Sequence, residues 1–358
     1  MTYTKDQLEA ETDRLFAALR HAGWVREECR LHAPLTLEIR DRAKAKKAVI
    51  LAHSYMTPDI LYGIADFRGD SLGLSEMARD TDAEVIVFCG VRFMAETAKV
   101  LSPKKTVLLP APDAGCSLSE AITGADVRAL RLQHPGAAVV CYVNTDAAVK
   151  AECDACVTSA NAVDVVMGLA EQKIVFLPDK YMAQNLRNCC PGKEIIDWDG
   201  RCIVHEQFTP ERAKAWKDAY PGAHMLVHTE CTSSVVGLAD MAGGTGDMID
   251  YVRKNPAVHD FMLVTECGLS DRMRVEFPDR RFIGTCGLCP HMKRVELRKV
   301  LEVLESPRPD QIIEVPEDIR VRALRSLERM FELTKTKKGD RWKPLPVASA
   351  EQEARPAS

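Results

Sequence analysis

Three cysteines recur at an almost constant spacing along this 358-residue chain: Cys116, Cys202 and Cys289 lie 86 and 87 residues apart. Each follows a short apolar run, in the stretches TVLLPAPDAGC, EIIDWDGRC and RFIGTCGLC. A fixed spacing of this length indicates an internal repeat with one cysteine per copy. Three thiolates without a fourth fit a [4Fe–4S] cluster that leaves one iron open to substrate as a Lewis acid. A zinc ion held by the three cysteines and a histidine such as His205 is the alternative.

The remaining cysteines do not predict a disulfide framework. The chain holds thirteen, an odd number, and its first residues, MTYTKDQLEAETDRLF, lack an export signal. We therefore expect reduced thiols, most of them small buried side chains such as Cys89 and Cys141, which lie inside apolar runs. Cys286, three residues before Cys289, is a bystander or its redox partner.

The elements around the cysteines repeat as well. The stretches HPGAAVVCYVN and YPGAHMLVHTE align, and KKAVILAHSY supplies a third copy, which makes Tyr55, Tyr142 and His228 equivalent positions. EVIVFCG, KIVFLPD and FMLVTECG are the next strands, and segments with helical spacing, such as SLGLSEMARDT and GTGDMIDYVRKN, separate the runs. Ser71, Ser159 and Thr245 each open the first helix of their copy, where a hydroxyl caps the helix or binds an anion.

Strands that alternate with helices predict an α/β protein with parallel sheets covered on both faces. We expect three α/β/α sandwich domains with small sheets, related by a pseudo-threefold axis, and an active site at their junction, because ligands gather beyond the carboxyl ends of parallel strands. The predicted segments are a helical extension at 1–35, repeats at 36–130, 131–217 and 218–305, a helical segment at 306–340, and a mobile tail at 341–358.

Composition excludes other classes of protein. The formal charge of -4 and the lack of a basic run interleaved with aromatics predict no nucleic-acid partner. No apolar stretch approaches the length of a membrane span, so we expect no membrane partner and a cytoplasmic location.

With these residues in view, the chain resembles the quinolinate synthase family, the iron–sulfur enzymes of NAD biosynthesis, over nearly all of 36–305. The matching stretches are HSY, GDSL, FCGVRFMAETAKVLSP, DAGCSL, CYVNT, TSANA, LPDKYMAQN, GRCIVHEQF, HTE and CPHMK. The resemblance implies a triangular protein of three α/β domains in which Cys116, Cys202 and Cys289 hold one [4Fe–4S] cluster per chain. It also implies a reaction that joins iminoaspartate to dihydroxyacetone phosphate and releases quinolinate, phosphate and two waters. An L-aspartate oxidase is then a candidate functional partner.

The implied reaction assigns roles to polar residues of the repeat. The expected substrate-binding residues are His53, Ser71, Tyr142, Asn144, Ser159, His228, Glu230 and Thr245. The expected catalytic residues are Glu230 as general base, with Tyr55, Tyr142, His205 and His228. The alternatives are a solvated acid for Glu230, core groups with satisfied hydrogen bonds for Tyr55, His205 and His228, and helix caps for the three hydroxyls.

The chain departs from the family pattern at two places. Gly244 stands where the family usually has a serine, which puts one donor to phosphate in doubt. GTCGLC has two cysteines where some relatives have three, so a disulfide between Cys286 and Cys289 is a hypothesis only. An iron–sulfur hydro-lyase acting on a hydroxy diacid is the alternative enzyme, and a cluster-binding module without activity is the second alternative.

Overall fold

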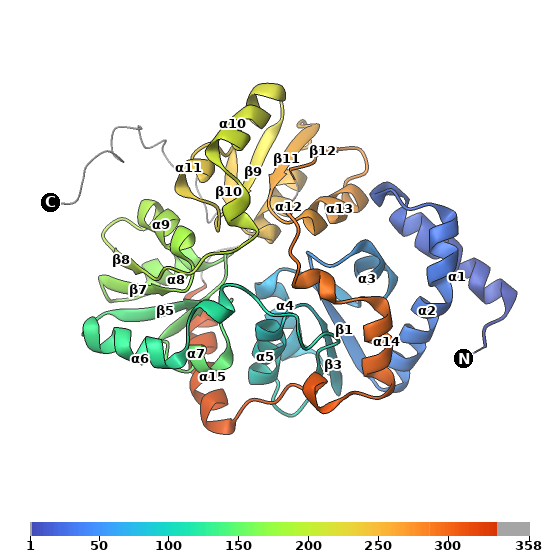
Figure 1. Cartoon of the computed structure of the whole chain (residues 1–358), viewed down its shortest axis with the longest axis horizontal. Coiled ribbons are helices and arrows are strands. Elements are labelled where there is room, and N and C mark those ends of the chain that lie inside the picture. The colour runs from blue at the N-terminus through green and yellow to red at the C-terminus, as the bar shows by residue number, and fades with distance from the viewer. Residues whose placement is uncertain (1, 286, 335–358) are drawn as a thin grey trace.

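Three separate sheets, each of four parallel strands, organise the chain, as the computed structural model shows for residues 2–285 and 287–334 (Figure 1). We call each sheet with its helices a unit. The sheets have equivalent strand orders: β2-β1-β3-β4 in unit 1, β6-β5-β7-β8 in unit 2 and β10-β9-β11-β12 in unit 3. The predicted α/β class with three small parallel sheets is confirmed.

The strands have closely similar lengths in the three units. Unit 1 contains β1 (Ala48–His53), β2 (Phe67–Gly69), β3 (Val85–Cys89) and β4 (Thr106–Leu108). Unit 2 contains β5 (Ala138–Tyr142), β6 (Ala155–Val157), β7 (Lys173–Leu177) and β8 (Glu194–Asp197). Unit 3 contains β9 (His224–His228), β10 (Met241–Gly243), β11 (Asp260–Val264) and β12 (Arg281–Ile283).

The helices repeat in the same order along the chain. The first copy has α3 (Pro58–Gly63), α4 (Ser71–Asp80), α5 (Arg92–Leu101), the 3₁₀ turn η2 (Ser119–Ala121) and α6 (Gly124–Gln133). The second copy has α7 (Ala147–Lys150), α8 (Ala162–Gly168), α9 (Lys180–Cys189), η3 (His205–Gln207) and α10 (Pro210–Ala219). The third copy has α11 (Ser233–Val236), α12 (Thr245–Lys254), α13 (Cys267–Glu276), η4 (Met292–Arg294) and α14 (Leu297–Glu305). The last helix of each copy packs on another sheet's unit: α6 contacts α7 of unit 2, α10 contacts α11 of unit 3, and α14 contacts β3 of unit 1 and α2 (Figure 1).

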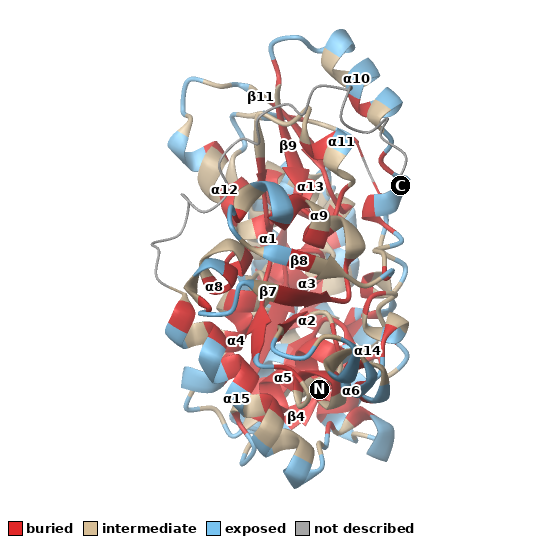
Figure 2. Cartoon of the chain, turned by 90° about the vertical axis from the view of Figure 1, so that its left-hand side faces the viewer, coloured by how far each residue is buried: buried red, intermediate tan, exposed pale blue. Residues whose placement is uncertain are grey.

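The strands are buried because helices cover both faces of each sheet. All five residues of β5 are buried, as are the last four of β7 and β11. Figure 2 shows the buried strands inside the molecule and the exposed residues along the outer faces of the helices. This arrangement explains why the strands read as continuous apolar runs rather than as an alternation.

The structure corrects the alignment of the first repeat. In the strand register, His53, Tyr142 and His228 lie opposite Gly69, Val157 and Gly243, the last residues of the neighbouring edge strands. His53, rather than Tyr55, is therefore the equivalent of Tyr142 and His228. Tyr55 instead matches Asn144 and Glu230, two residues beyond the strand end. The predicted equivalence of Tyr55 was wrong because strand ends cannot be fixed from an apolar run alone.

Sequence reasoning also missed the edge strands β2, β6 and β10 and the short helices α3, α7 and α11 that precede them. Each of these strands has only three residues and lies outside any longer apolar run, whereas the equally short β4 and β12 fall within the runs TVLLP and RFIG. Consequently α4 and α12 are the second helices of their units rather than the first.

The three units surround a common centre and give the molecule a triangular outline (Figure 1). In parallel sheets of this kind the carboxyl ends of the strands carry the ligand-binding loops. The cavity described below, which residues from all three units line, lies at their junction.

Helices outside the repeats brace the units. The N-terminal pair α1 (Lys5–Leu19) and α2 (Arg26–Ala45), joined by η1 (Arg20–Ala22), packs through Leu15, Leu19, Cys29 and Ala33. Helix α2 runs across the boundary that we placed after residue 35, and the segment boundaries stay a prediction. After η5 (Pro309–Gln311), α15 (Glu317–Leu333) packs against unit 2 (Figure 1). The expected tail at 341–358 lies outside the described residues.

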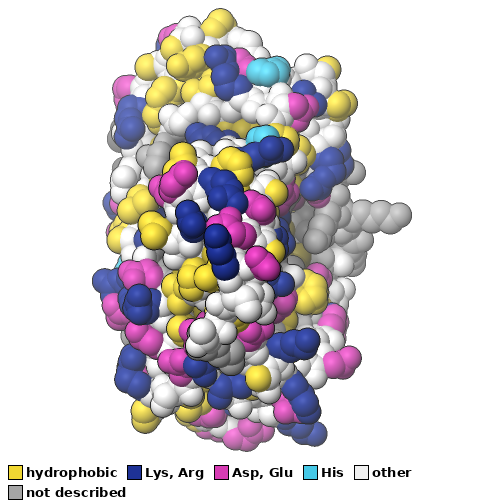
Figure 3. Space-filling model, turned by 90° about the vertical axis from the view of Figure 1, so that its right-hand side faces the viewer, with side chains coloured by type: hydrophobic (Ala, Val, Ile, Leu, Met, Phe, Trp, Pro, Cys, Tyr) yellow, Lys and Arg dark blue, Asp and Glu magenta, His cyan; other side chains and the backbone are white. Residues whose placement is uncertain are grey.

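The surface carries mixed charge on the face near the N-terminal helices, where basic and acidic side chains are interspersed (Figure 3). Arg26 pairs there with Glu9 and Asp13. Across residues 2–285 and 287–334, no helix is both long and apolar enough to cross a membrane.

Candidate active site

A cavity lies where the three units meet. Cys116, Cys202 and Cys289 all line it, one from each unit, and all three are free thiols. Every other predicted site residue lines it too: His53, Tyr55, Ser71, Tyr142, Asn144, Ser159, His205, His228, Glu230 and Thr245. The fold thus brings together all the residues that the sequence singled out for chemistry, although their individual roles stay predictions.

One backbone hydrogen bond, repeated in every unit, holds the loops that carry the cysteines. The donor is the residue at the start of α5, α9 or α13, and the acceptor is the carbonyl two residues before each cysteine. These bonds are Arg92 N to Ala114 O (2.9 Å), Lys180 N to Gly200 O (2.9 Å) and Cys267 N to Gly287 O (3.0 Å). Each cysteine then leads into a 3₁₀ turn, so the repeat places the three thiols in equivalent surroundings.

The surroundings of the three thiols disfavour free thiolates. Burial raises the pKa of Cys116 to about 12 and also raises the pKa of Cys202 and Cys289, although backbone N–H groups of the following turns hydrogen-bond the sulfurs and partly oppose this rise. The thiolates of Cys116 and Cys289, and those of Cys202 and Cys116, are near enough to repel one another. A bound metal centre would remove this repulsion and replace the thiol protons. The donor set therefore fits an iron–sulfur cluster.

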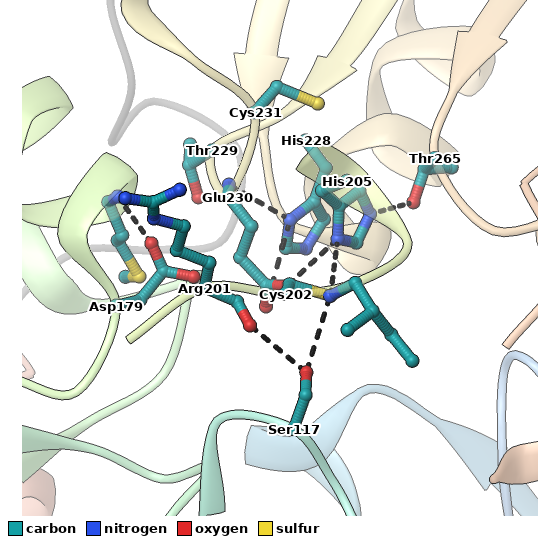
Figure 4. Close-up of polar contacts among 12 residues, drawn as sticks. Ser117, Asp179, Arg201, Cys202, His205, His228, Thr229, Glu230, Cys231 and Thr265 are labelled. Atoms are coloured by element: carbon teal, nitrogen blue, oxygen red, sulfur yellow. Dashed lines mark hydrogen bonds and ion pairs between the residues drawn. The ribbon is translucent and has the colours of Figure 1, made fainter. Parts of the chain in front are cut away.

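Glu230 lies at the centre of a buried hydrogen-bond network (Figure 4). Its carboxylate accepts from the Tyr142 hydroxyl at 2.6 Å and from His205 Nδ1 at 2.8 Å. Burial alone would raise the pKa of Glu230, but its electrostatic interactions with His205 and His228 and these hydrogen bonds outweigh burial and hold the pKa well below its usual range. Glu230 is thus an ionised carboxylate at neutral pH, which is the form that a base needs. With 3% of its surface exposed it is not a solvated acid.

His205 links this carboxylate to the proposed metal ligands and to unit 1. Its Nδ1 lies 3.3 Å from Cys202 Sγ, and its Nε2 lies 3.0 Å from Thr265 Oγ1. Thr265 Oγ1 is in turn 2.8 Å from the Tyr55 hydroxyl. Cys202, His205 and Glu230 offer ligand atoms within 4.8 Å of one another, which makes them a second candidate metal-binding group.

His53 and His228 are neutral imidazoles with equivalent hydrogen bonds. The backbone N–H two residues further on donates to Nδ1 in each, from Tyr55 at 3.3 Å and from Glu230 at 3.2 Å. Burial, followed by the charges of neighbouring cations, lowers the pKa of both histidines to about 3. Because Nδ1 accepts a hydrogen bond, Nε2 carries the proton. Both rings therefore offer a neutral donor at the cavity.

The three hydroxyl side chains are equivalent, each two residues after an edge strand, but they do not cap helices. Ser71 and Thr245 are the first residues of α4 and α12, whose N-caps are Asp70 and Gly244. Ser159 lies two residues before the N-cap of α8, Asn161, so the prediction that it opens a helix was wrong. All three line the cavity.

Gly244 sits against Ser159. A Cβ added at Gly244 would lie 2.4 Å from Ser159 Oγ and 3.1 Å from Ser159 Cβ. The Ser159 hydroxyl therefore occupies the space that a side chain at position 244 would need, and it would have to rotate to admit one. The disulfide hypothesis, in contrast, involves Cys286, which lies outside the described residues.

Sequence reasoning missed several groups at the site. Asp70, Phe93, Glu266 and His291 line the cavity, and Thr265 bridges Tyr55 and His205 behind it. Glu266 is fully buried and pairs with Lys293 at 2.9 Å. The repeat gave no signal for Thr265, because residues of other types, Gly90 and Pro178, follow the equivalent strands β3 and β7.

Comparison with known proteins identifies the family. Residues 37–332 match the family model described as quinolinate synthetase A protein. The quinolinate synthase of Caulobacter vibrioides (strain NA1000 / CB15N) is 44% identical over 332 residues, which cover 91% of this chain and 89% of that protein. Quinolinate synthase 1 of Mesorhizobium japonicum is 48% identical over 80% of this chain and 88% of its own length. The quinolinate synthase of Xylella fastidiosa (strain Temecula1) is 48% identical over 81% and 84%. The chain therefore belongs to the quinolinate synthase family.

Proposed function

We propose that this protein condenses iminoaspartate with dihydroxyacetone phosphate to quinolinate, releasing phosphate and two waters, as a step of NAD biosynthesis. The observation that carries the proposal is the shared cavity, in which three free cysteines from three units lie beside the Glu230 network. A cytoplasmic location and functional coupling to an L-aspartate oxidase belong to this proposal as expectations from the sequence.

Cys116, Cys202 and Cys289 would hold one [4Fe–4S] cluster per chain. When bound, a cluster with three cysteine ligands supplies an open iron, a Lewis acid suited to the loss of water. A zinc ion bound by Cys202, His205 and Glu230 is the alternative, because the ligand atoms of these residues lie within 4.8 Å of one another. Metal analysis distinguishes the two.

The protein's own residues bind and orient the substrates. The Nε2–H groups of His53 and His228 and the amide of Asn144 donate to carboxylate oxygens of iminoaspartate. Ser71 and Ser159 add hydroxyl donors from equivalent positions. Thr245 and the backbone N–H groups that begin α12 bind the phosphate of the second substrate, because a helix N-terminus favours an anion.

Glu230 acts as the general base. It is ionised and held by Tyr142 and His205, so it can take a proton from a substrate carbon or nitrogen that lies in the cavity. Burial and the nearby Glu230 carboxylate keep the pKa of Tyr142 and of Tyr55 well above 10, so both phenols keep their protons and serve as donors. His205 orients the carboxylate and connects it through Thr265 to Tyr55.

The test is quinolinate formation by anaerobically purified protein given both substrates, with iron and zinc measured on the same sample. Cys289→Ala should abolish product and lower the iron content. Cys190→Ala, which removes a buried thiol outside the cavity, should change neither. Protein that holds an intact cluster but forms no quinolinate would contradict the proposal, and turnover of fumarate or malate would support the hydro-lyase instead.

A further inference from the structure

The turn after the central strand differs in one of the three units. In unit 1 the Met56 N–H donates to the His53 carbonyl at 2.9 Å, and in unit 3 the Cys231 N–H donates to the His228 carbonyl at 3.0 Å. These are the i to i+3 bonds of β-turns. In unit 2 the equivalent N–H, that of Thr145, donates to Val143 O at 2.8 Å instead.

The unit 2 turn is therefore a tighter one, closed between i and i+2. The Tyr142 carbonyl, which loses the backbone N–H that its equivalents receive, accepts from the Thr145 hydroxyl at 3.1 Å. The chain enters the turn in the same way in units 1 and 2, since Ser54 N donates to Gly69 O at 2.9 Å and Val143 N donates to Val157 O at 2.7 Å. The difference thus lies in the turn itself.

A buried lysine accompanies this altered turn. Lys150, the last residue of α7, has no exposed surface. Its Nζ donates to Val143 O at 2.8 Å, to Thr145 O and to Thr145 Oγ1 at 3.4 Å. It also lies 5.6 Å from the ring centroid of Phe93, which lines the cavity. Burying a lysine is unfavourable unless its three donors are satisfied, and here the turn satisfies all three.

The repeat supplies an internal control. At the position equivalent to Lys150, unit 1 has Leu61 at the same step of α3, and unit 3 has Val236 at the end of α11. Both side chains are buried and apolar, with 0% and 3% of their surface exposed. The two units without a donor at this position have the ordinary turn, and the unit with the lysine has the altered one.

The altered turn carries Asn144 at its centre, between the two residues whose carbonyls Lys150 binds. Asn144 lines the cavity next to Tyr142. Within residues 2–285 and 287–334, no side chain or backbone group hydrogen-bonds the Asn144 amide, so the amide stays available to a bound molecule. We propose that Lys150 is a positioning residue that clamps this turn and aims the Asn144 amide at a substrate carboxylate; the identity of that substrate rests on the proposed function above.

The test compares Lys150→Met, which keeps the length of the side chain but removes its donors, with Asn144→Ala and the double variant. We expect kcat/KM for quinolinate formation to fall about 10- to 100-fold in Lys150→Met, mostly through KM, because a misaimed amide loses a hydrogen bond to a charged group. In the Asn144→Ala background the same substitution should have little further effect on kcat/KM. Lys99→Met is the matched control, since Lys99 is also buried and donates to a backbone carbonyl, Lys105 O at 3.2 Å, outside the cavity.

A crystal structure of Lys150→Met provides a readout that does not depend on activity. We expect the Thr145 N–H to move to the Tyr142 carbonyl, as in units 1 and 3. If Lys150→Met does not fold, Thr145→Val removes two bonds of the same turn and should give a smaller fall in kcat/KM. Unchanged kcat/KM, or an equal fall with and without Asn144, would overturn the proposal. If the parent forms no quinolinate, the proposed function fails, and the geometry of the turn in the variant structure still decides the role of Lys150.

Discussion

Acidification should destabilise the protein through His53 and His228. Both side chains are buried, with 5% and 3% of their surface exposed, and both have a pKa of about 3 in the folded state. In the unfolded chain a histidine titrates near pH 6.5. Between about pH 3 and 6.5 the unfolded chain therefore binds protons that the folded protein does not. The free energy of unfolding rises with pH across this window, and the contribution of the two histidines reaches its full value above it.

The size of the effect follows from these values. At pH 5 an unfolded histidine lies about 1.5 pH units below its pKa, and each unit corresponds to about 1.4 kcal/mol. Each histidine should thus remove about 2 kcal/mol of stability between pH 7 and pH 5. Burial raises the pKa of Asp179, which acts in the opposite direction over the same range because the folded protein then retains a proton. The difference between variant and parent isolates the histidine contribution.

Urea unfolding of the cluster-free protein at pH 5, 6 and 7 measures this difference. In His228→Gln the loss of stability from pH 7 to pH 5 should be about 2 kcal/mol smaller than in the parent. His259→Gln is the control, because this histidine is exposed. Parallel pH profiles for His228→Gln and the parent would refute the argument that burial keeps this imidazole neutral.

Three further predictions concern the site. Glu230→Gln should lower kcat about 10²- to 10⁴-fold while iron content is retained, whereas the exposed Glu211→Gln should not; unchanged turnover would show that Glu230 is not the base. Gly244→Ser should raise KM for dihydroxyacetone phosphate, because the new side chain displaces the Ser159 hydroxyl. Gly222→Ser is the control and should leave KM unchanged, because no atom lies within 4 Å of the added Cβ. A lower KM in Gly244→Ser would contradict this reasoning. After cluster reconstitution, Cys202→Ser should lack the visible absorbance of the cluster and most of the iron. Cys153→Ser, which changes a thiol outside the cavity, should keep both. Equal iron in the two variants would argue against Cys202 as a ligand.

Several features could be predicted from the sequence because they depend on local pattern. The apolar runs predicted nine of the twelve strands, and the constant spacing of Cys116, Cys202 and Cys289 predicted three equivalent units that share one site. A repeat must place equivalent residues in equivalent surroundings, so spacing alone was enough to select the cysteines and the three hydroxyls. The edge strands β2, β6 and β10 could not be found in this way, since each has only three residues, FRG, ACV and MAG, and lies outside any longer apolar run.

Only the tertiary structure decided the matters that depend on contacts between units and on exact strand ends. The strand register shows that His53, rather than Tyr55, is the equivalent of Tyr142. An apolar run alone cannot resolve this shift of two residues. The bridge from Tyr55 through Thr265 and His205 to Glu230 joins three units, and no sequence pattern links these residues. Likewise the sequence shows a lysine at position 150, but not its contact with the Asn144 turn. That contact forms only when the chain folds back and buries Lys150 Nζ against the carbonyls of Val143 and Thr145. The sequence by itself determined which residues repeat, and packing determined what each of them contacts.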